Sequence, residues 1–200
     1  MFSVNSHRGR YTVDIRSDLP ENEFEDSFIM IDSKVLYLYP HLGALVDDSR
    51  VIPISAFEHN KTLHYCTSLI DSLIEKGFKK NNNLVAIGGG ITQDVTSFVA
   101  SILFRGVEWK FIPTTLLAQA DSCIGSKTSI NVGDIKNVLG TFYPPTKIWC
   151  IESFLQTLSP NDIKCGIGEI LHYYLIVDHP SAKVIGKTTK HFTDHIKASL

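Results

Sequence analysis

The hydrophobic and polar residues of this chain follow two different periods. Short, continuous apolar runs are typical of strands buried on both faces of a parallel sheet, whereas strict alternation at Tyr11, Val13 and Ile15 predicts a half-buried strand. The segment 35–39 is either a strand or a helix. Strands are predicted at 11–15, 28–31, 51–54, 84–87, 107–112 and 147–151.

Helical spacing dominates three further segments. Apolar residues recur every three or four positions over 61–76, and Gly77 is suited to a C-cap. A second helical pattern follows Gly88-Gly89-Gly90, with Thr92 as the expected N-cap, and a third begins at Asn161. Because strands alternate with helices, the pattern indicates that the chain winds back and forth across one sheet.

This order of elements predicts an α/β fold. We expect a Rossmann-like, mainly parallel sheet in an N-terminal domain, followed by the start of an α-helical domain. The boundary is expected near Leu158-Ser159-Pro160, which gives domains at 1–159 and 160–200.

Composition and charge narrow the possible partners. The 200 residues include 19 basic and 21 acidic side chains, for a net charge of −2, so no basic excess exists to neutralise nucleic acid or a membrane surface. The four cysteines form no C-x-x-C pair, which indicates reduced thiols rather than a zinc knuckle. The N-terminus lacks a signal-peptide pattern, and no apolar run is long enough for a membrane span. A cytoplasmic location is expected.

Two turns at strand ends could bind phosphate. Gly88-Gly89-Gly90 follows a predicted strand and enters a helix, where glycines let a pyrophosphate approach the backbone and the helix N-terminus favours an anion. Pro113-Thr114-Thr115 also follows a strand, and its hydroxyl groups could bond a phosphate or a ribose. A plain tight turn and a threonine helix cap explain the same residues about equally well.

A second group of polar residues lies in a Gly-, Ser- and Asn-rich segment that is predicted to be irregular. Asp121, Lys127, Lys136 and Asn137 could bind and orient an anionic substrate there, although a solvated loop would have a similar composition. Arg105 follows a helix, where it could bind phosphate or only complement the helix dipole.

Glu169 stands in an apolar helical pattern, where a carboxylate needs a partner. A metal ion is one such partner, and a buried lysine or arginine is another. His172 lies three residues further on, at a spacing that can present two ligands to one metal. A histidine packed and hydrogen-bonded in the core is the reading we favour for His172.

Together, these residues resemble the family of 3-dehydroquinate synthase and the related sugar phosphate cyclases. The resemblance begins at Glu58-x-x-Lys61, includes the glycine turn up to Asp94, and ends at Gly166-x-x-Glu169. Between them it includes Arg105-Gly106, Pro113-Thr-Thr-Leu-Leu-Ala118, Asp121-Ser-x-x-Gly-x-Lys127-Thr128, Lys136-Asn137-x-x-Gly140, Phe142-Tyr-x-Pro145 and Thr157-Leu158. Members of this family are far longer, so their C-terminal part is expected to be missing here.

The resemblance implies an NAD-binding α/β domain, the beginning of a helical domain for metal and substrate, and a cytoplasmic homodimer. It assigns NAD+ binding to Asp32, Glu58, Lys61, Gly88, Gly89, Gly90, Asp94, Thr114, Thr115, Lys136, Phe154 and Thr157. It assigns catalysis and substrate contact to Asp121, Lys127, Asn137, Arg105 and His172, with Arg105 reaching the substrate phosphate in the partner subunit. Glu169 matches the first ligand of a zinc (or cobalt) ion, while His191 and His195 match no metal motif.

The implied reaction is the 3-dehydroquinate synthase-like formation of a carbocycle from a seven-carbon sugar-acid phosphate. Transient oxidation by NAD+ next to a divalent metal allows phosphate elimination, and reduction, ring opening and an aldol step follow. In such a lyase the protein chiefly orients the reactants and places charge.

Three residues depart from the family pattern. His172 stands where dehydroquinate synthases usually have a lysine, and Gln93 and Ser126 replace common glycines. The alternatives are therefore another sugar phosphate cyclase, a related NAD- and metal-dependent polyol dehydrogenase, or a non-catalytic remnant that binds NAD+.

Overall fold

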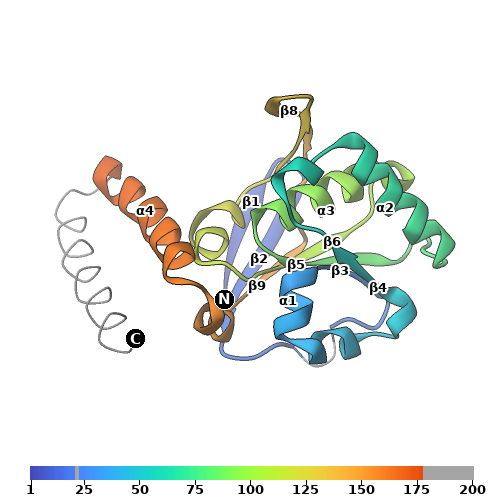
Figure 1. Ribbon diagram of the computed structural model, residues 1–200, viewed down its shortest axis with the longest axis horizontal. Coiled ribbons are helices and arrows are strands. Elements are labelled where there is room, and N and C mark those ends of the chain that lie inside the picture. The colour runs from blue at the N-terminus through green and yellow to red at the C-terminus, as the bar shows by residue number, and fades with distance from the viewer. Residues whose placement is uncertain (21–22, 178–200) are drawn as a thin grey trace.

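Seven strands form one sheet in the order β1-β2-β9-β6-β5-β3-β4 (Figure 1). The computed structural model describes residues 1–20 and 23–177. Neighbouring strands are parallel, except for β1 and β2, which form an antiparallel hairpin at one edge. The strands are β1 (Phe2–Ser6), β2 (Gly9–Arg16), β3 (Ser27–Asp32), β4 (Val51–Ile54), β5 (Asn83–Gly88), β6 (Trp109–Pro113) and β9 (Lys147–Ile151).

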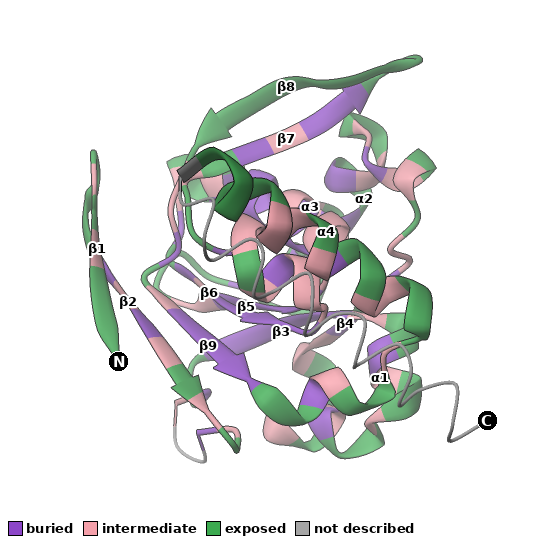
Figure 2. Cartoon of the chain, turned by 90° about the vertical axis from the view of Figure 1, so that its left-hand side faces the viewer, coloured by how far each residue is buried: buried purple, intermediate pink, exposed green. Residues whose placement is uncertain are grey.

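Helices cover both faces of this sheet, so the central strands are buried (Figure 2). α2 and α3 pack through Leu69, Leu73, Val95 and Val99 on one face. α1 packs through Val35 on the other, together with short 3-10 turns. The helices are α1 (Ser33–Leu38), α2 (Leu63–Glu75), α3 (Gly90–Ile102) and α4 (Pro160–Val177). The short 3-10 turns are η1 (Pro40–Leu45), η2 (Asp48–Arg50), η3 (Glu58–Asn60), η4 (Leu103–Arg105) and η6 (Glu152–Thr157), and η5 (Ala118–Ser122) is a π-helical turn.

The expected α/β fold with a Rossmann-like, mainly parallel sheet is confirmed. α2 begins directly after its N-cap Thr62, and its C-cap, expected at Gly77, is the preceding residue Lys76. The Thr62 side chain accepts a hydrogen bond from the Tyr65 amide at its start, and Gly77, at a φ of 84°, follows its C-cap Lys76.

One local expectation is wrong, and one open alternative is decided. Thr92 is not the N-cap of α3, because Gly89 occupies that position and the helix begins directly within the glycine turn. The Thr92 hydroxyl is instead buried without a partner among the described residues. The segment 35–39 takes the helical alternative as α1, because the Asp32 carboxylate caps it by accepting from the Lys34 amide.

The segment expected to be irregular contains a two-stranded antiparallel ribbon, β7 (Lys127–Val132) and β8 (Ile135–Phe142). Gly133 provides the left-handed turn between them, at a φ of 57°. Every residue of β8 is exposed, so the strand shows none of the alternation by which a half-buried strand is recognised. The ribbon stands apart from the main sheet (Figure 1).

α4 begins at Pro160, at the expected end of the sheet domain. The division at 159 stays a prediction, and His191 and His195 lie outside the described residues. Among the described residues, no helix has both the length and the apolar character that crossing a membrane requires.

Candidate functional site

The glycine turn forms the floor of the candidate site. β5 ends at Gly88 and α3 begins at Gly90, so the turn lies at the carboxyl edge of a parallel sheet. A Cβ atom on Gly88 would lie 2.5 Å from the Thr92 hydroxyl oxygen, and one on Gly89 would lie 3.1 Å from Thr115 Cγ2. A side chain on Gly88 would force Thr92 to move, and one on Gly89 would require Thr115 to shift by a few tenths of an ångström, so the close approach of these residues favours glycine in the turn.

The threonine pair lies beside the glycine turn. Thr114 is buried, and its amide donates to the Gly88 carbonyl at 2.9 Å. The Thr115 hydroxyl accepts from the Ala118 amide at 3.2 Å, so it does act as a helix cap. Thr115 also lines two adjoining grooves, so it can cap the following helical turn and contact a ligand at the same time.

These two grooves contain most of the residues expected to bind NAD+. The smaller groove, of about 100 Å³, is lined by Asp32, Thr114, Thr115, Phe154 and Thr157, among others. The larger, of about 420 Å³, is lined by Glu58, Lys61, Gly90, Asp94 and Thr115, among others. Since Thr115 belongs to both, an extended ligand could follow the two grooves past the glycine turn.

Asp32 lies at the carboxyl end of β3, at the rim of the smaller groove. Burial raises the pKa of its carboxyl group, whereas the Lys34 amide, 2.9 Å away, lowers it. An acidic side chain at the end of such a strand is suited to accept hydrogen bonds from ribose hydroxyl groups.

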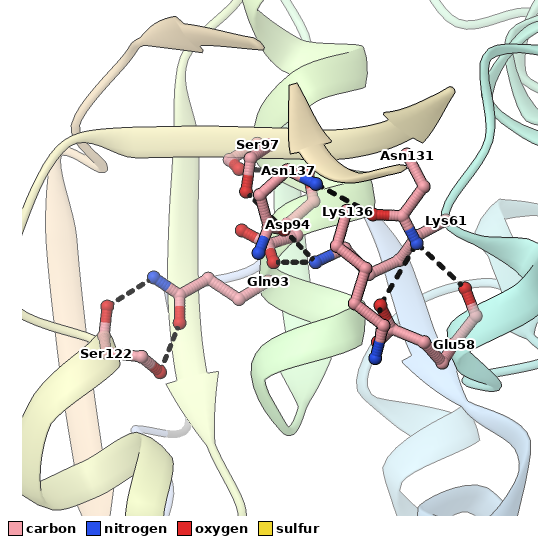
Figure 3. A network of polar contacts seen from close by, with 10 residues as sticks. Glu58, Lys61, Gln93, Asp94, Ser97, Ser122, Asn131, Lys136 and Asn137 are labelled. Atoms are coloured by element: carbon pink, nitrogen blue, oxygen red, sulfur yellow. Dashed lines mark hydrogen bonds and ion pairs between the residues drawn. The ribbon is translucent and has the colours of Figure 1, made fainter. Parts of the chain in front are cut away.

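Lys61 is the centre of a polar network between α3 and the ribbon (Figure 3). Its ammonium group donates to Asp94 at 2.7 Å and to Asn137 Oδ1 at 2.8 Å. The Lys61 side chain is 6% exposed. Burial raises the pKa of Asp94, and the neighbouring Lys61 opposes this shift.

A second part of the network holds Glu58 against the ribbon. Asn131 Nδ2 donates to the Glu58 carboxylate at 3.0 Å and to its backbone carbonyl at 3.3 Å, and Lys136 Nζ lies 3.6 Å from the same carboxylate (Figure 3). These contacts, led by the Asn131 hydrogen bond, lower the pKa of Glu58. Asn131 Oδ1 accepts from the Asn137 amide at 2.9 Å, so the Asn131 side chain holds both Glu58 and Asn137 in place.

Asn137 adopts a left-handed backbone conformation, with a φ of 58°. Its Oδ1 atom accepts from Lys61 and from the Ser129 hydroxyl, at 2.8 and 3.0 Å. An ammonium group can only donate, so the oxygen of the amide must face Lys61 and the nitrogen must point away. Within the described chain, Nδ2 donates to no acceptor and remains available to a ligand.

The other expected substrate residues occupy two places near the network. Lys127 and Asn137 line an open cavity of about 460 Å³ along the ribbon. Asp121 lies in the π-helical turn η5, and its carboxylate accepts from the Tyr173 hydroxyl of α4 at 2.6 Å. This contact raises the pKa of Tyr173.

Arg105 is not gathered with the other expected residues. It is exposed in η4, at a φ of 65°, and it lines none of these three cavities. The strain of the turn is shared with Phe104, at a φ of 48°.

Among the described residues, the metal expectation has a single candidate ligand. Glu169 is half-exposed on α4, and no group of three histidine, cysteine or acidic side chains within 1–20 and 23–177 could hold a metal ion. A catalytic zinc ion needs three protein ligands, so these residues alone do not fit one. The reading of His172 as a core histidine is wrong, because its side chain is exposed beside Tyr173.

Sequence reasoning did not assign a role to Asn131 or Ser122. Ser122 bonds the side chain of Gln93, which the sequence marked only as a departure from glycine. Asn131 is a polar residue that is buried next to the apolar Ile130 in β7. A polar side chain beside an apolar one in this strand was the sequence signal that could have indicated a buried contact.

Comparisons with known proteins agree with this architecture. Residues 51–165 match the family model described as 3-dehydroquinate synthase N-terminal. The 3-dehydroquinate synthase of Sulfurisphaera tokodaii is 42% identical over 156 residues, which are 74% of this chain and 44% of that protein. The chain thus spans about half the length of the curated relatives it matches.

Solved structures give the same result. A 2-deoxy-scyllo-inosose synthase complexed with carbaglucose-6-phosphate, NAD+ and Co2+ is 28% identical, with a TM-score of 0.71 over 83% of this chain and 48% of that one. The 2-epi-5-epi-valiolone synthase of Streptomyces hygroscopicus, with NAD+ and Zn2+ bound, is 25% identical, with a TM-score of 0.73 over 95% of this chain and 62% of that one. On these grounds, the chain belongs to the 3-dehydroquinate synthase family of sugar phosphate cyclases.

Proposed function

We propose that this chain forms the NAD+-binding and substrate-orienting half of a 3-dehydroquinate synthase-like lyase. Its substrate would be a seven-carbon sugar-acid phosphate, from which phosphate is eliminated as a carbocycle forms. The main support is the meeting of two grooves at Thr115, beside the glycine turn and the Lys61 network. Two similar solved structures, which hold NAD+ with Co2+ or with Zn2+, support the same cofactor.

The residues of the two grooves fit a dinucleotide. Asp32 and Thr157 would bind ribose hydroxyl groups in the smaller groove, and Phe154 would pack against an aromatic ring of the cofactor there. The closely packed Gly88–Gly90 turn would accept the pyrophosphate at the N-terminus of α3. When bound, NAD+ supplies a transient hydride acceptor.

The ribbon and η5 would orient the substrate. Lys127 is an exposed ammonium group on β7 that would bind a phosphate or carboxylate. The outward Nδ2 of Asn137 would donate to a substrate hydroxyl group, and the Asp121 carboxylate would accept from another. The lone Glu169 is given no chemical step, because the described residues do not complete a metal site.

Binding of NAD+ is the first test. Titration calorimetry is expected to detect one NAD+ site, and Gly89→Val should weaken it at least about tenfold, because the added methyl groups would crowd Thr115 and narrow the path between the grooves. Gly168→Ala is the matched control, because a Cβ there meets no atom within 4 Å. Absence of NAD+ binding in the wild-type chain would overturn the proposal.

Turnover is the second test, and it separates the alternatives. Release of inorganic phosphate from the seven-carbon substrate without net NADH formation would identify a cyclase, because a cyclase returns its hydride. Net NADH formation from a polyol would identify a dehydrogenase. NAD+ binding without either reaction would identify a chain that binds the cofactor but does not act alone.

We also propose a cytoplasmic homodimer, to which Arg105 would contribute across the interface. Its exposed position, outside the cavities described above, suits a residue that reaches a second copy. Exposed apolar side chains along the ribbon, including Ile135 and Phe142, are suited to the contact. Sedimentation velocity should find a dimer that Phe142→Glu weakens and Ile74→Glu, on exposed α2, does not.

A further inference from the structure

Gln93 joins the glycine turn to the turn that carries Asp121. It lies in the first turn of α3, where its side chain is buried. Gln93 Nε2 donates to the Ser122 carbonyl at 2.5 Å, and Gln93 Oε1 accepts from the Ser122 hydroxyl at 2.8 Å (Figure 3). Residues 29 positions apart are therefore held by two reciprocal hydrogen bonds.

The two hydrogen bonds between Gln93 and Ser122 form because η5 leaves backbone groups unpaired at its end. This segment is a π-helical turn, in which the Cys123 amide donates back to Ala118 at 3.0 Å. The carbonyl groups at the end of such a turn have no partner within it. Gln93 supplies a donor to the last of them, Ser122, and thereby fixes where the turn ends.

The backbone of Gln93 is tied to the opposite side. Its amide donates to the Gly89 carbonyl at 3.0 Å, as the first hydrogen bond of α3. A Cβ on Gly90 would lie 3.9 Å from the Ser122 hydroxyl oxygen, so the two turns are neighbours in space. Gln93 alone therefore connects the glycine turn to Ser122, so a displacement of that turn would also move Ser122.

We propose that Gln93 is a positioning residue that couples occupation of the glycine turn by NAD+ to the order of the Asp121 turn. The inference rests on the proposed NAD+ function. With NAD+ at the first turn of α3, Gln93 is held in place and keeps Ser122, and hence Asp121, oriented toward the substrate. The Tyr173 hydroxyl holds Asp121 from the side of α4, so the turn is fixed between two helices.

Hydrogen exchange followed by mass spectrometry tests the coupling. Wild type, Gln93→Met and Ser97→Ala would be compared with and without saturating NAD+. Met keeps the length of the side chain but removes both hydrogen bonds to Ser122. Ser97 is the matched control, because its hydroxyl, also on α3, bonds only the Asp94 carbonyl of its own helix, at 3.1 Å.

Without NAD+, Gln93→Met is expected to exchange about 30-fold faster than wild type over 118–124, the factor that corresponds to two lost hydrogen bonds. NAD+ should protect both 86–94 and 118–124 in wild type and in Ser97→Ala. In Gln93→Met, protection should persist at 86–94 and be lost at 118–124. A purely structural role would change the NAD+-free exchange but leave the NAD+ response intact.

Two results would overturn the inference, and they are distinguishable. NAD+ protection of 118–124 in Gln93→Met equal to that in wild type would disprove the coupling while leaving NAD+ binding established. Absence of protection at 86–94 in wild type would instead disprove the NAD+ proposal, and the coupling with it. Ser122→Ala, which removes one of the two hydrogen bonds, should give an intermediate loss if the coupling holds.

Discussion

The ammonium group of Lys61 lies 2.7 Å from the carboxylate of Asp94, across the gap between η3 and α3. The same group donates to Asn137 of the ribbon, so one buried cation connects three parts of the chain that are distant in sequence. A buried cation destabilises the folded state unless its partners surround it. Disruption of the Lys61 network should therefore lower the stability of the native fold.

Lys61→Met is expected to lower the free energy of unfolding by about 2 kcal/mol. The substitution keeps the buried stem but leaves Asp94 without its cation. The effect should be smaller than the ~3–5 kcal/mol typical of fully buried pairs, because the Asp94 side chain is 24% exposed. Urea denaturation measures it.

Lys136→Met is the control for that measurement. Its ion pair with Glu58 is exposed, at 3.6 Å, and its loss should change stability by less than about 0.5 kcal/mol. Equal effects of the two substitutions would show that burial does not distinguish the pairs.

Glu58 and Asp94 should titrate on opposite sides of their ordinary pKa values. The pKa of Glu58 is lowered below 4.5, so its contribution to stability is present above that pH and is lost as pH falls through the folded value. The pKa of Asp94 is raised above 3.8, so its contribution is present below that pH and is lost as pH rises through the folded value.

Asn131→Ala should raise the pKa of Glu58 toward 4.5, because the Asn131 hydrogen bond is the largest cause of the shift. Carbon-13 NMR of the side-chain carboxyl groups measures this. Ser129→Ala, in the same strand but without contact to Glu58, should leave the titration unchanged. A Glu58 pKa that is insensitive to Asn131 would contradict the contact.

Two glycines of α4 should respond oppositely to alanine. A Cβ on Gly166 would lie 2.5 Å from Leu116 Cγ and 2.8 Å from the Leu117 amide nitrogen, so Gly166→Ala should destabilise by about 1–3 kcal/mol. Gly168 has open space around it, so Gly168→Ala should stabilise the helix by about 0.5–1 kcal/mol.

Thermal unfolding of the two variants measures the difference. A loss of stability in Gly168→Ala, or no loss in Gly166→Ala, would show that α4 does not pack against Leu116 and Leu117 as described.

Cys165 should be the first of the four thiols to react with Ellman's reagent in the native chain. It is exposed on α4, whereas Cys66, Cys123 and Cys150 are buried. Burial also raises the pKa of Cys66 to about 12, which keeps that thiol protonated and unreactive at neutral pH.

Cys165→Ser should remove the fast phase, and Cys66→Ser should leave it. All four thiols should react in urea. A second fast thiol in the native chain would mean that one of the buried cysteines is accessible.

The family motifs and the parallel strands were predictable because each depends on residues that are adjacent in the sequence. The Gly88–Gly90 turn lies between a short apolar run and a helical pattern, and neither needs distant residues to form. The start of α3 was misplaced at Thr92, because a glycine turn can itself serve as the N-cap when packing holds it closely.

The ribbon could not be predicted from periodicity. β8 is exposed along its whole length, so hydrophobic alternation carries no information about its pairing with β7. That pairing brings Asn137 to Lys61 across 76 positions and Asn131 to Glu58 across 73. The exposed position of His172 likewise follows from what packs around α4, and not from the helical spacing around it.

The sequence by itself determined the family, the Rossmann-like sheet and the position of the glycine turn, because short-range patterns and ordered motifs suffice for these. Only the tertiary structure decided how the polar residues interact. The Lys61 network and the Gln93–Ser122 pair each join segments that no local pattern relates. Their geometry depends on the burial of polar groups, and buried polar groups are stabilised only when distant partners complete their hydrogen bonds.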